Sequence, residues 1–123
     1  MVGVYFSGTG NTKFCIEYFI NGLDKFSKCY SIEDKNVISE ILKSENIVLA
    51  YPIYYSNLPK IVRDFIYNNS NIWKDKKVYI IATMGLFSGD GTGLSARILK
   101  KFGAKIIGAY ILKCLTALEM LKH

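Results

Sequence analysis

Short apolar runs alternate along the chain with segments whose apolar residues recur every three or four positions. The runs are rich in β-branched and aromatic residues and predict strands, whereas the spaced segments predict amphipathic helices. The predicted strands cover residues 2–6, 28–32, 46–52, 77–83 and 105–112. The predicted helices cover residues 11–23 (with Asn11 or Thr12 as the cap), 36–44, 59–68 and 91–102, and Gly103 ends the last one.

The strands differ in how deeply the pattern buries them. Residues 46–52 and 77–83 are almost continuously apolar, which predicts strands covered on both faces, as in parallel sheets. Residues 28–32 are half polar, which predicts a strand at the sheet edge. The inward positions of the first helix are predicted from its apolar residues, namely Phe14, Cys15, Tyr18, Phe19 and Leu23. Regular alternation of strand and helix indicates an α/β protein with a doubly wound parallel sheet and right-handed crossovers.

Small and hydroxylated residues follow the first predicted strand and lead into the first helix. They are Ser7, Gly8, Thr9, Gly10, Asn11 and Thr12. Glycines let the backbone approach an anion closely, and a helix that starts there presents its positive end to the same anion. The side chains add further hydrogen-bond donors, so this stretch is predicted to cradle a phosphate group.

Two common phosphate loops fit this stretch incompletely. A Walker A loop, G-x-x-x-x-G-K-[ST], matches at Gly3 and Gly8, but Thr9 stands where the lysine belongs. A dinucleotide fingerprint, G-x-G-x-x-G, matches at its first two glycines, but Lys13 replaces the third.

A third pattern, S-x-T-G-N-T, fits residues 7–12 at every position. With this loop the chain resembles the flavodoxins, from Met1 to about Leu112. The resemblance implies a three-layer α/β sandwich whose five-stranded parallel sheet has the order 2-1-3-4-5, and FMN bound where the strand order reverses. Flavodoxins close one sheet face with a fifth helix. Residues 116–123 can form roughly two helical turns, so we expect that helix to be short or truncated. The sheet face then stays partly uncovered, is covered by a partner, or belongs to a longer protein, and an uncovered apolar face would favour self-association.

The loops after the third and fourth predicted strands should meet the phosphate loop at one sheet edge, because ligands bind beyond the carboxyl ends of parallel strands. The second loop supplies Pro52, Ile53, Tyr54, Tyr55, Ser56 and Asn57. Tyr54 and Tyr55 are candidates for a flat wall against the flavin ring, although in a chain with nine tyrosines they could instead cover core. The spacing P-x-Y-x-x-x-x-P resembles clostridial flavodoxins and the flavodoxin part of flavodoxin–ferredoxin fusions, but the glycine that many flavodoxins carry in this loop is missing.

The third loop supplies Thr83, Met84, Gly85, Phe87, Gly89 and Asp90. Its glycines would let backbone N–H groups reach the flavin carbonyl oxygens, and Phe87 or Met84 would line the ring. Asp90 is either a ligand of the ribityl chain or a turn residue.

The net charge is +6, and from Arg97 onward there are six basic residues and one acidic residue. The lysines are scattered and no recognition motif accompanies them, so we do not expect nucleic-acid binding. A basic surface would instead steer an acidic redox partner of ferredoxin or oxidoreductase type. Flavodoxins are commonly acidic, so this charge departs from the family.

The cysteines, Cys15, Cys29 and Cys114, are widely spaced, and the single histidine is the last residue. This spacing does not suit a metal or iron–sulfur site. Reduced thiols in a cytoplasmic protein fit best. No apolar run reaches the length of a membrane span, and no secretory signal is expected.

Near the three loops there is no acid–base pair or nucleophile, so no catalytic residue is predicted. The chain is interpreted as a single domain, residues 1–123, that binds FMN and carries electrons between proteins. Three alternatives remain open. They are an FMN-dependent NAD(P)H:quinone-type reductase, a domain that has lost FMN or binds another phosphate ligand, and the flavin domain of a longer flavin and iron–sulfur protein.

Overall fold

A computed structural model describes residues 1–6, 11–25, 27–53, 58–84 and 92–113. In this part of the chain the strands form one five-stranded sheet with the order β2-β1-β3-β4-β5, and every pair is parallel. The strands are β1 (Val2–Tyr5), β2 (Lys28–Ser31), β3 (Asn46–Pro52), β4 (Lys77–Met84) and β5 (Lys105–Lys113). This confirms the order that the resemblance implies, and it confirms the half-polar second strand at a sheet edge.

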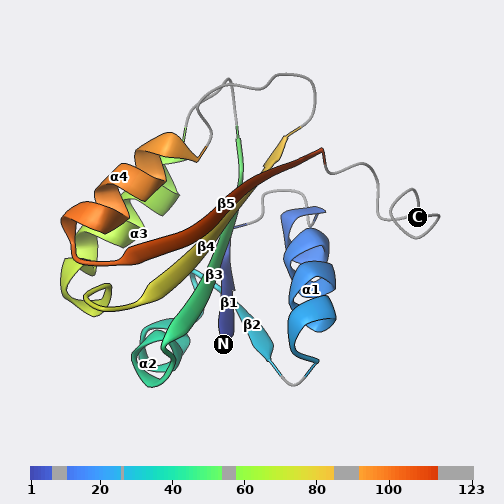
Figure 1. Cartoon of the computed structure of the whole chain (residues 1–123), viewed down its shortest axis with the longest axis horizontal. Helices are drawn as coiled ribbons and strands as arrows, with labels where there is room; N and C mark the ends of the chain where they lie inside the picture. The colour runs from blue at the N-terminus through green and yellow to red at the C-terminus, as the bar shows by residue number, and fades with distance from the viewer. Residues whose placement is uncertain (7–10, 26, 54–57, 85–91, 114–123) are drawn as a thin grey trace.

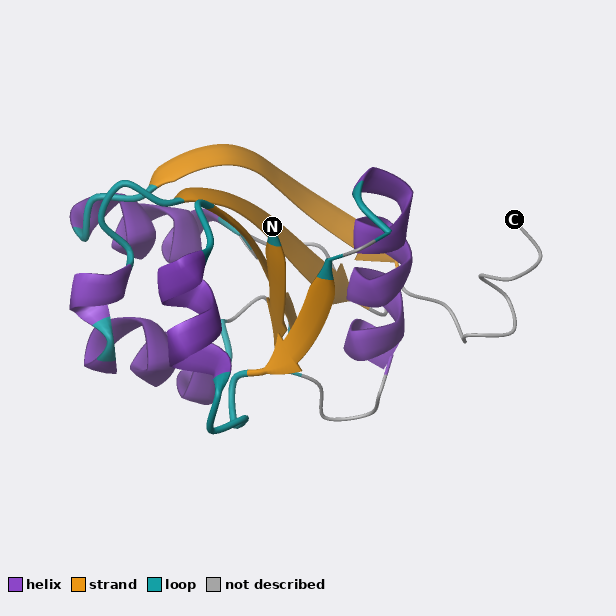
Figure 2. Cartoon of the chain, turned by 90° about the horizontal axis from the view of Figure 1, so that it is seen from below, coloured by secondary structure: helices purple, strands orange, loops and turns teal. Residues whose placement is uncertain are grey.

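The helices cover the two faces of the sheet unequally (Figures 1 and 2). Among the described residues, α1 (Asn11–Leu23) lies by itself on one face, while α2 (Val37–Lys43), α3 (Lys60–Asn68) and α4 (Gly93–Lys101) lie on the other. A short 3-10 helix, η1 (Ser70–Ile72), follows α3. The short fifth helix expected at residues 116–123 lies outside the described residues.

The predicted element bounds agree with the structure to within two residues. Where a predicted strand end differs from the observed one, backbone hydrogen bonding explains the difference. The fourth and fifth strands each continue one residue farther than predicted, to Met84 and Lys113, because these two residues still pair with each other. The last helix ends before Gly103, whose φ of 95° is the left-handed conformation that glycine adopts most easily.

The larger core lies between the sheet and α2, α3 and α4. It is built from apolar side chains of alternate strand positions and of the inner helix faces. Trp73, which follows η1, is fully buried there, and its indole N–H donates to the carbonyl oxygen of Ile66 at 3.3 Å. That bond satisfies the polar end of a side chain whose ring contributes a large apolar area.

The smaller core, which we call the α1 core, contains the buried residues Ile16, Ile20, Val48, Ala50 and Ile81. It corrects the predicted inward face of α1, because Tyr18 and Leu23 are each 56% exposed. The buried stripe runs instead through positions 12, 15, 16 and 20, so it includes the polar Thr12. The prediction is confirmed for Cys15, which is buried, and for Phe19, which packs against the α1 core, and it is wrong for Tyr18 and Leu23. Exposed aromatic and aliphatic residues are common on protein surfaces, so apolar character alone does not identify the buried face.

Gly3 in β1 lets α1 pack closely on the sheet. A Cβ atom at this position would lie 2.5 Å from Cδ1 of Ile20 and 2.8 Å from Sγ of Cys29. Both distances are shorter than ordinary van der Waals contact, so the helix as placed requires a residue without a side chain at this point. This packing fixes the position of α1, and with it the start of the helix that the phosphate loop precedes.

Candidate functional site

The three strand ends that are predicted to carry binding loops lie next to one another. The strands β1, β3 and β4 are neighbours in the sheet and parallel, so their carboxyl ends reach the same edge (Figure 1). Backbone bonds join them at that edge. The N–H of Phe6 donates to the carbonyl oxygen of Ala50 at 3.0 Å, and the N–H of Ile53 donates to that of Thr83 at 2.8 Å. The fold therefore brings the flanks of all three predicted loops together.

A pair of threonines links the phosphate-loop helix to the fourth strand. Thr12 is 2% exposed and Thr83 is 4% exposed, and their Oγ1 atoms are 3.0 Å apart. One hydroxyl donates to the other, so the accepting hydroxyl still has a proton to give. The first turn of α1 contains no acidic residue, and its positive end is therefore not neutralised from within the turn. This arrangement suits an anion.

The structure describes some of the predicted site residues and not others. Thr12, Thr83 and Ile53 are brought together by the two hydrogen bonds given above, and Pro52 pairs with Thr83 in the sheet register. Asn11 begins α1 and Met84 ends β4. The other predicted site residues lie outside the described residues, namely Ser7, Gly8, Thr9, Gly10, Tyr54, Tyr55, Ser56, Asn57, Gly85, Phe87, Gly89 and Asp90.

Two residues near this edge were not among the predicted site residues. Tyr51, the residue before Pro52, and Ser95, in the first turn of α4, are fully buried, and their side-chain oxygens are 2.5 Å apart. Tyr51 lies in an apolar strand and Ser95 in a helix, 44 positions apart in the chain. No local pattern in the sequence indicates that they meet.

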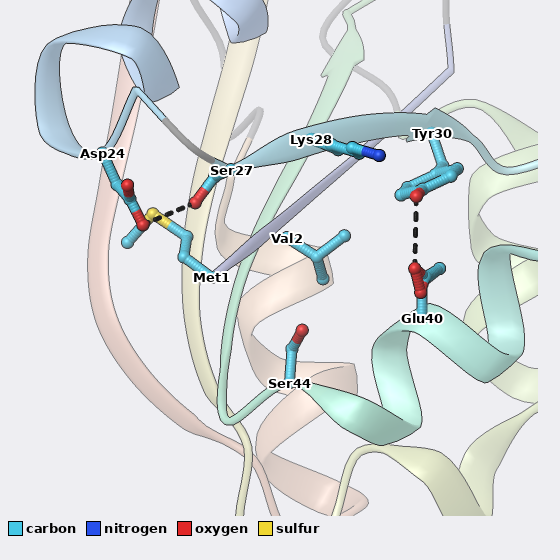
Figure 3. A pocket seen from close by; sticks show the side chains of 8 residues that line it. All are labelled: Met1, Val2, Asp24, Ser27, Lys28, Tyr30, Glu40 and Ser44. Atoms are coloured by element: carbon cyan, nitrogen blue, oxygen red, sulfur yellow. Dashed lines mark hydrogen bonds between the residues drawn. The ribbon is translucent and has the colours of Figure 1, made fainter.

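A cavity of about 340 Å³ lies at the opposite edge of the sheet (Figure 3). Its lining includes Met1, Lys28 and Ser44, from the beginnings of β1 and β2 and the end of α2. Tyr30 donates to Oε1 of Glu40 at 3.1 Å across it. Ligands of parallel α/β sheets bind beyond the carboxyl ends of the strands, so this cavity is not the candidate cofactor site.

Neither of the two described cysteines, Cys15 and Cys29, takes part in the candidate site. Burial raises the pKa of the Cys29 thiol to about 11, with a further contribution from the nearby Glu17 carboxylate, so this free thiol stays protonated at neutral pH. Cys15 is buried and disulfide-bonded, so the expectation of a reduced thiol is wrong for this residue. Cys114 lies outside the described residues.

Neither a metal-binding cluster nor a membrane-spanning helix is found among the described residues. They contain no group of three or more side chains that could hold a metal ion. None of their helices has the length and apolar character needed to cross a membrane.

Known proteins with the same fold are numerous, although a search of curated proteins finds no match to this sequence. The flavodoxin of Megasphaera elsdenii in its two-electron reduced form is 24% identical, with a TM-score of 0.78 over 94% of this chain and 88% of that one. An archaeal flavodoxin is 22% identical, with a TM-score of 0.77 over 98% and 90%. The flavodoxin of Fusobacterium nucleatum bound to flavin mononucleotide is 19% identical, with a TM-score of 0.62 over 86% and 68%.

These structures share the fold, and a family model adds evidence from the sequence. The model described as a flavodoxin domain matches residues 3–106, which include the predicted phosphate loop and extend to the start of β5. The chain therefore belongs to the flavodoxin-domain family.

Proposed function

We propose that this protein binds FMN and carries electrons between redox partner proteins. The observation that carries the proposal is the buried pair of Thr12 and Thr83, which places hydroxyl donors beside the N-terminus of α1. That helix end follows the loop S-G-T-G-N-T, the pattern of flavodoxin phosphate loops. Family membership and the FMN-bound flavodoxin with the same fold support the choice of ligand.

The residues at this edge fit the two ends of FMN. The FMN phosphate would be held by residues 7–12, whose donors carry no negative charge. The flavin ring would lie between residues 52–57 and residues 83–90, where Pro52 is partly exposed and the glycines would let backbone N–H groups approach the ring. The bound flavin supplies the electron chemistry, and the protein holds it and sets how readily it is reduced.

The visible absorbance spectrum of the purified protein tests this proposal. We expect a flavin spectrum that stays with the protein through desalting, either as purified or after addition of FMN. Folded protein that retains no flavin in excess FMN would contradict the proposal. Oxidation of NADH or NADPH by the loaded protein would favour the quinone-type reductase instead. A reading frame that continues into cysteine clusters would favour the flavin domain of a longer flavin and iron–sulfur protein.

We further propose an acidic redox partner. The last turn of α4 contains Lys100 and Lys101, both exposed, and the net charge of the chain is +6. Such a surface attracts an acidic partner over a distance of about 8–10 Å at physiological ionic strength. A cytoplasmic location remains a prediction from the sequence alone.

Self-association through the edge strand β5 is a separate proposal. Ile107, Tyr110 and Ile111 on this strand are 41–48% exposed, which leaves apolar surface at the edge of the sheet that the described strands form. Antiparallel pairing of two copies about Ala109 would place Lys105 of each copy opposite Lys113 of the other. Like charges at both ends would weaken such a dimer.

Ionic strength should act on these two interactions in opposite directions. Between about 50 and about 500 mM NaCl, electron transfer to an acidic partner should slow because salt screens the attraction. Over the same range the mass measured by light scattering should rise toward that of a dimer, because salt screens the repulsion between lysines. The variant Ile111→Lys should stay monomeric throughout. A dimer that weakens with salt would contradict pairing through β5.

A further inference from the structure

A chain of two hydrogen bonds connects the end of β3 to the start of α4. The hydroxyl oxygens of Tyr51 and Ser95 are 2.5 Å apart, and Oγ of Ser95 donates to the carbonyl oxygen of Thr92 at 3.1 Å. Tyr51 and Ser95 both have an exposed fraction of 0%. In the low dielectric of the interior, each of these bonds is stronger than it would be at the surface.

The direction of the protons follows from the donors available. A carbonyl oxygen only accepts, so the single hydroxyl proton of Ser95 is used in the bond to Thr92. Ser95 then accepts from Tyr51, whose phenol donates. The relay, as we call Tyr51, Ser95 and the Thr92 carbonyl, therefore runs in one direction from β3 to α4.

The ends of the relay lie beside the two loops that are predicted to hold the flavin ring. Tyr51 precedes residues 52–57, and Thr92 directly follows residues 85–91. The two loops are also joined where they begin, by the bond from the N–H of Ile53 to the carbonyl of Thr83. The end of β3 is thus bonded to both flanks of residues 85–91. Ile53 bonds to Thr83 before them through the backbone, and Tyr51 connects to Thr92 after them through the relay.

The relay helps to anchor the start of α4. Thr92 occupies the N-cap position of α4, but its side chain makes no capping hydrogen bond. The Thr92 carbonyl accepts from the N–H of Ala96 at 3.0 Å and from the Ser95 hydroxyl, and through Tyr51 this serine connects the helix end to a central strand. The relay thereby fixes the start of α4 relative to β3.

We infer that Tyr51 and Ser95 are positioning residues for FMN: the relay holds the end of β3 and the start of α4, which flank the two loops predicted to hold the flavin ring, at a fixed separation, and so raises FMN affinity. This inference rests on the proposed function. It concerns how the ring site is held, and it assigns neither residue a contact with the cofactor.

The test is a double-mutant cycle read out by FMN affinity. Ser95→Ala breaks both bonds of the relay, and we expect it to raise the Kd for FMN about tenfold. Tyr51→Phe removes the bond to Ser95 but leaves the bond from Ser95 to Thr92, and it should raise Kd about threefold. The two substitutions remove a shared interaction, so the Kd for FMN of the double variant should rise only about tenfold, well below the product of the two single effects.

A matched control separates this effect from the loss of any tyrosine hydroxyl. Tyr30→Phe removes the bond to Glu40 at the opposite edge of the sheet, and it should leave the Kd for FMN unchanged within about twofold. Thermal melting without FMN measures the stability of every variant. If Ser95→Ala does not fold, the comparison of Tyr51→Phe with Tyr30→Phe decides.

The possible outcomes separate a failure of this inference from a failure of the proposed function on which it rests. Wild-type protein that binds no FMN overturns both together. If the wild-type protein binds FMN, and the folded Tyr51→Phe and Ser95→Ala variants bind it with unchanged Kd, the inference about the relay is overturned but the proposed function stands. The two hydrogen bonds would then contribute to folding stability only. A raised Kd in both variants with an unchanged Tyr30→Phe supports the relay.

Discussion

Thr12→Val is expected to weaken FMN binding by about thirtyfold while leaving the fold intact. Valine has nearly the volume of threonine, so it fills the same buried space without the hydroxyl. A hydrogen bond to a charged group contributes about 1.5–3 kcal/mol, and the phosphate of FMN is such a group. The binding constant can be measured by quenching of flavin fluorescence on titration of the apoprotein.

The partner threonine provides the matched variant. Thr83→Val removes the other half of the 3.0 Å hydroxyl pair but leaves Thr12 in place, and we expect an effect of about threefold. An equal loss in the two variants would mean that the pair is needed only as a structural bond. No loss in either would remove Thr12 from the phosphate site.

Gly3→Ala is expected to destabilise the protein by about 1–3 kcal/mol, because the new methyl group overpacks the contact between β1 and α1. The built Cβ lies 2.5 Å from Cδ1 of Ile20, which must move or push the helix away. Denaturant unfolding, followed by far-ultraviolet circular dichroism, measures the change as a lower midpoint with an unchanged slope.

Gly22→Ala is the control for this substitution, and it should change the free energy of unfolding in the opposite direction. Gly22 lies near the end of the same helix, and no atom lies within 4 Å of a Cβ built there. Alanine restricts the unfolded chain and favours helix, so the variant should gain about 0.4–1 kcal/mol. If both variants change stability in the same direction, close packing at Gly3 is not the cause.

The sequence predicts this fold well because its patterns are local. Strand and helix periods, Gly103 and the half-polar second strand each depend on a few neighbouring residues, and the structure confirms all of them. The face of α1 was predicted less well. The exposed Tyr18 and the buried Thr12 depend on what the helix packs against, which periodicity alone does not contain.

The candidate site was predictable to the extent that it consists of a motif. Residues 7–12 and the loops after two buried strands were found from spacing, and the described part includes the contact between Thr12 and Thr83 that joins them. Tyr51 and Ser95 were not predicted, because a tyrosine in an apolar run and a serine in a helix are both common. Only the fold places their hydroxyl oxygens 2.5 Å apart.

The unequal cores have a consequence for motion. Among the described residues, α1 is buried through a small group of five side chains, whereas α2, α3 and α4 share the larger core. Segments with less buried apolar contact open at lower free energy, so amide hydrogens of α1 should exchange with solvent faster than those of the central strands. A ligand that binds only the closed form would slow that exchange, and part of its binding energy would go into holding the helix in place.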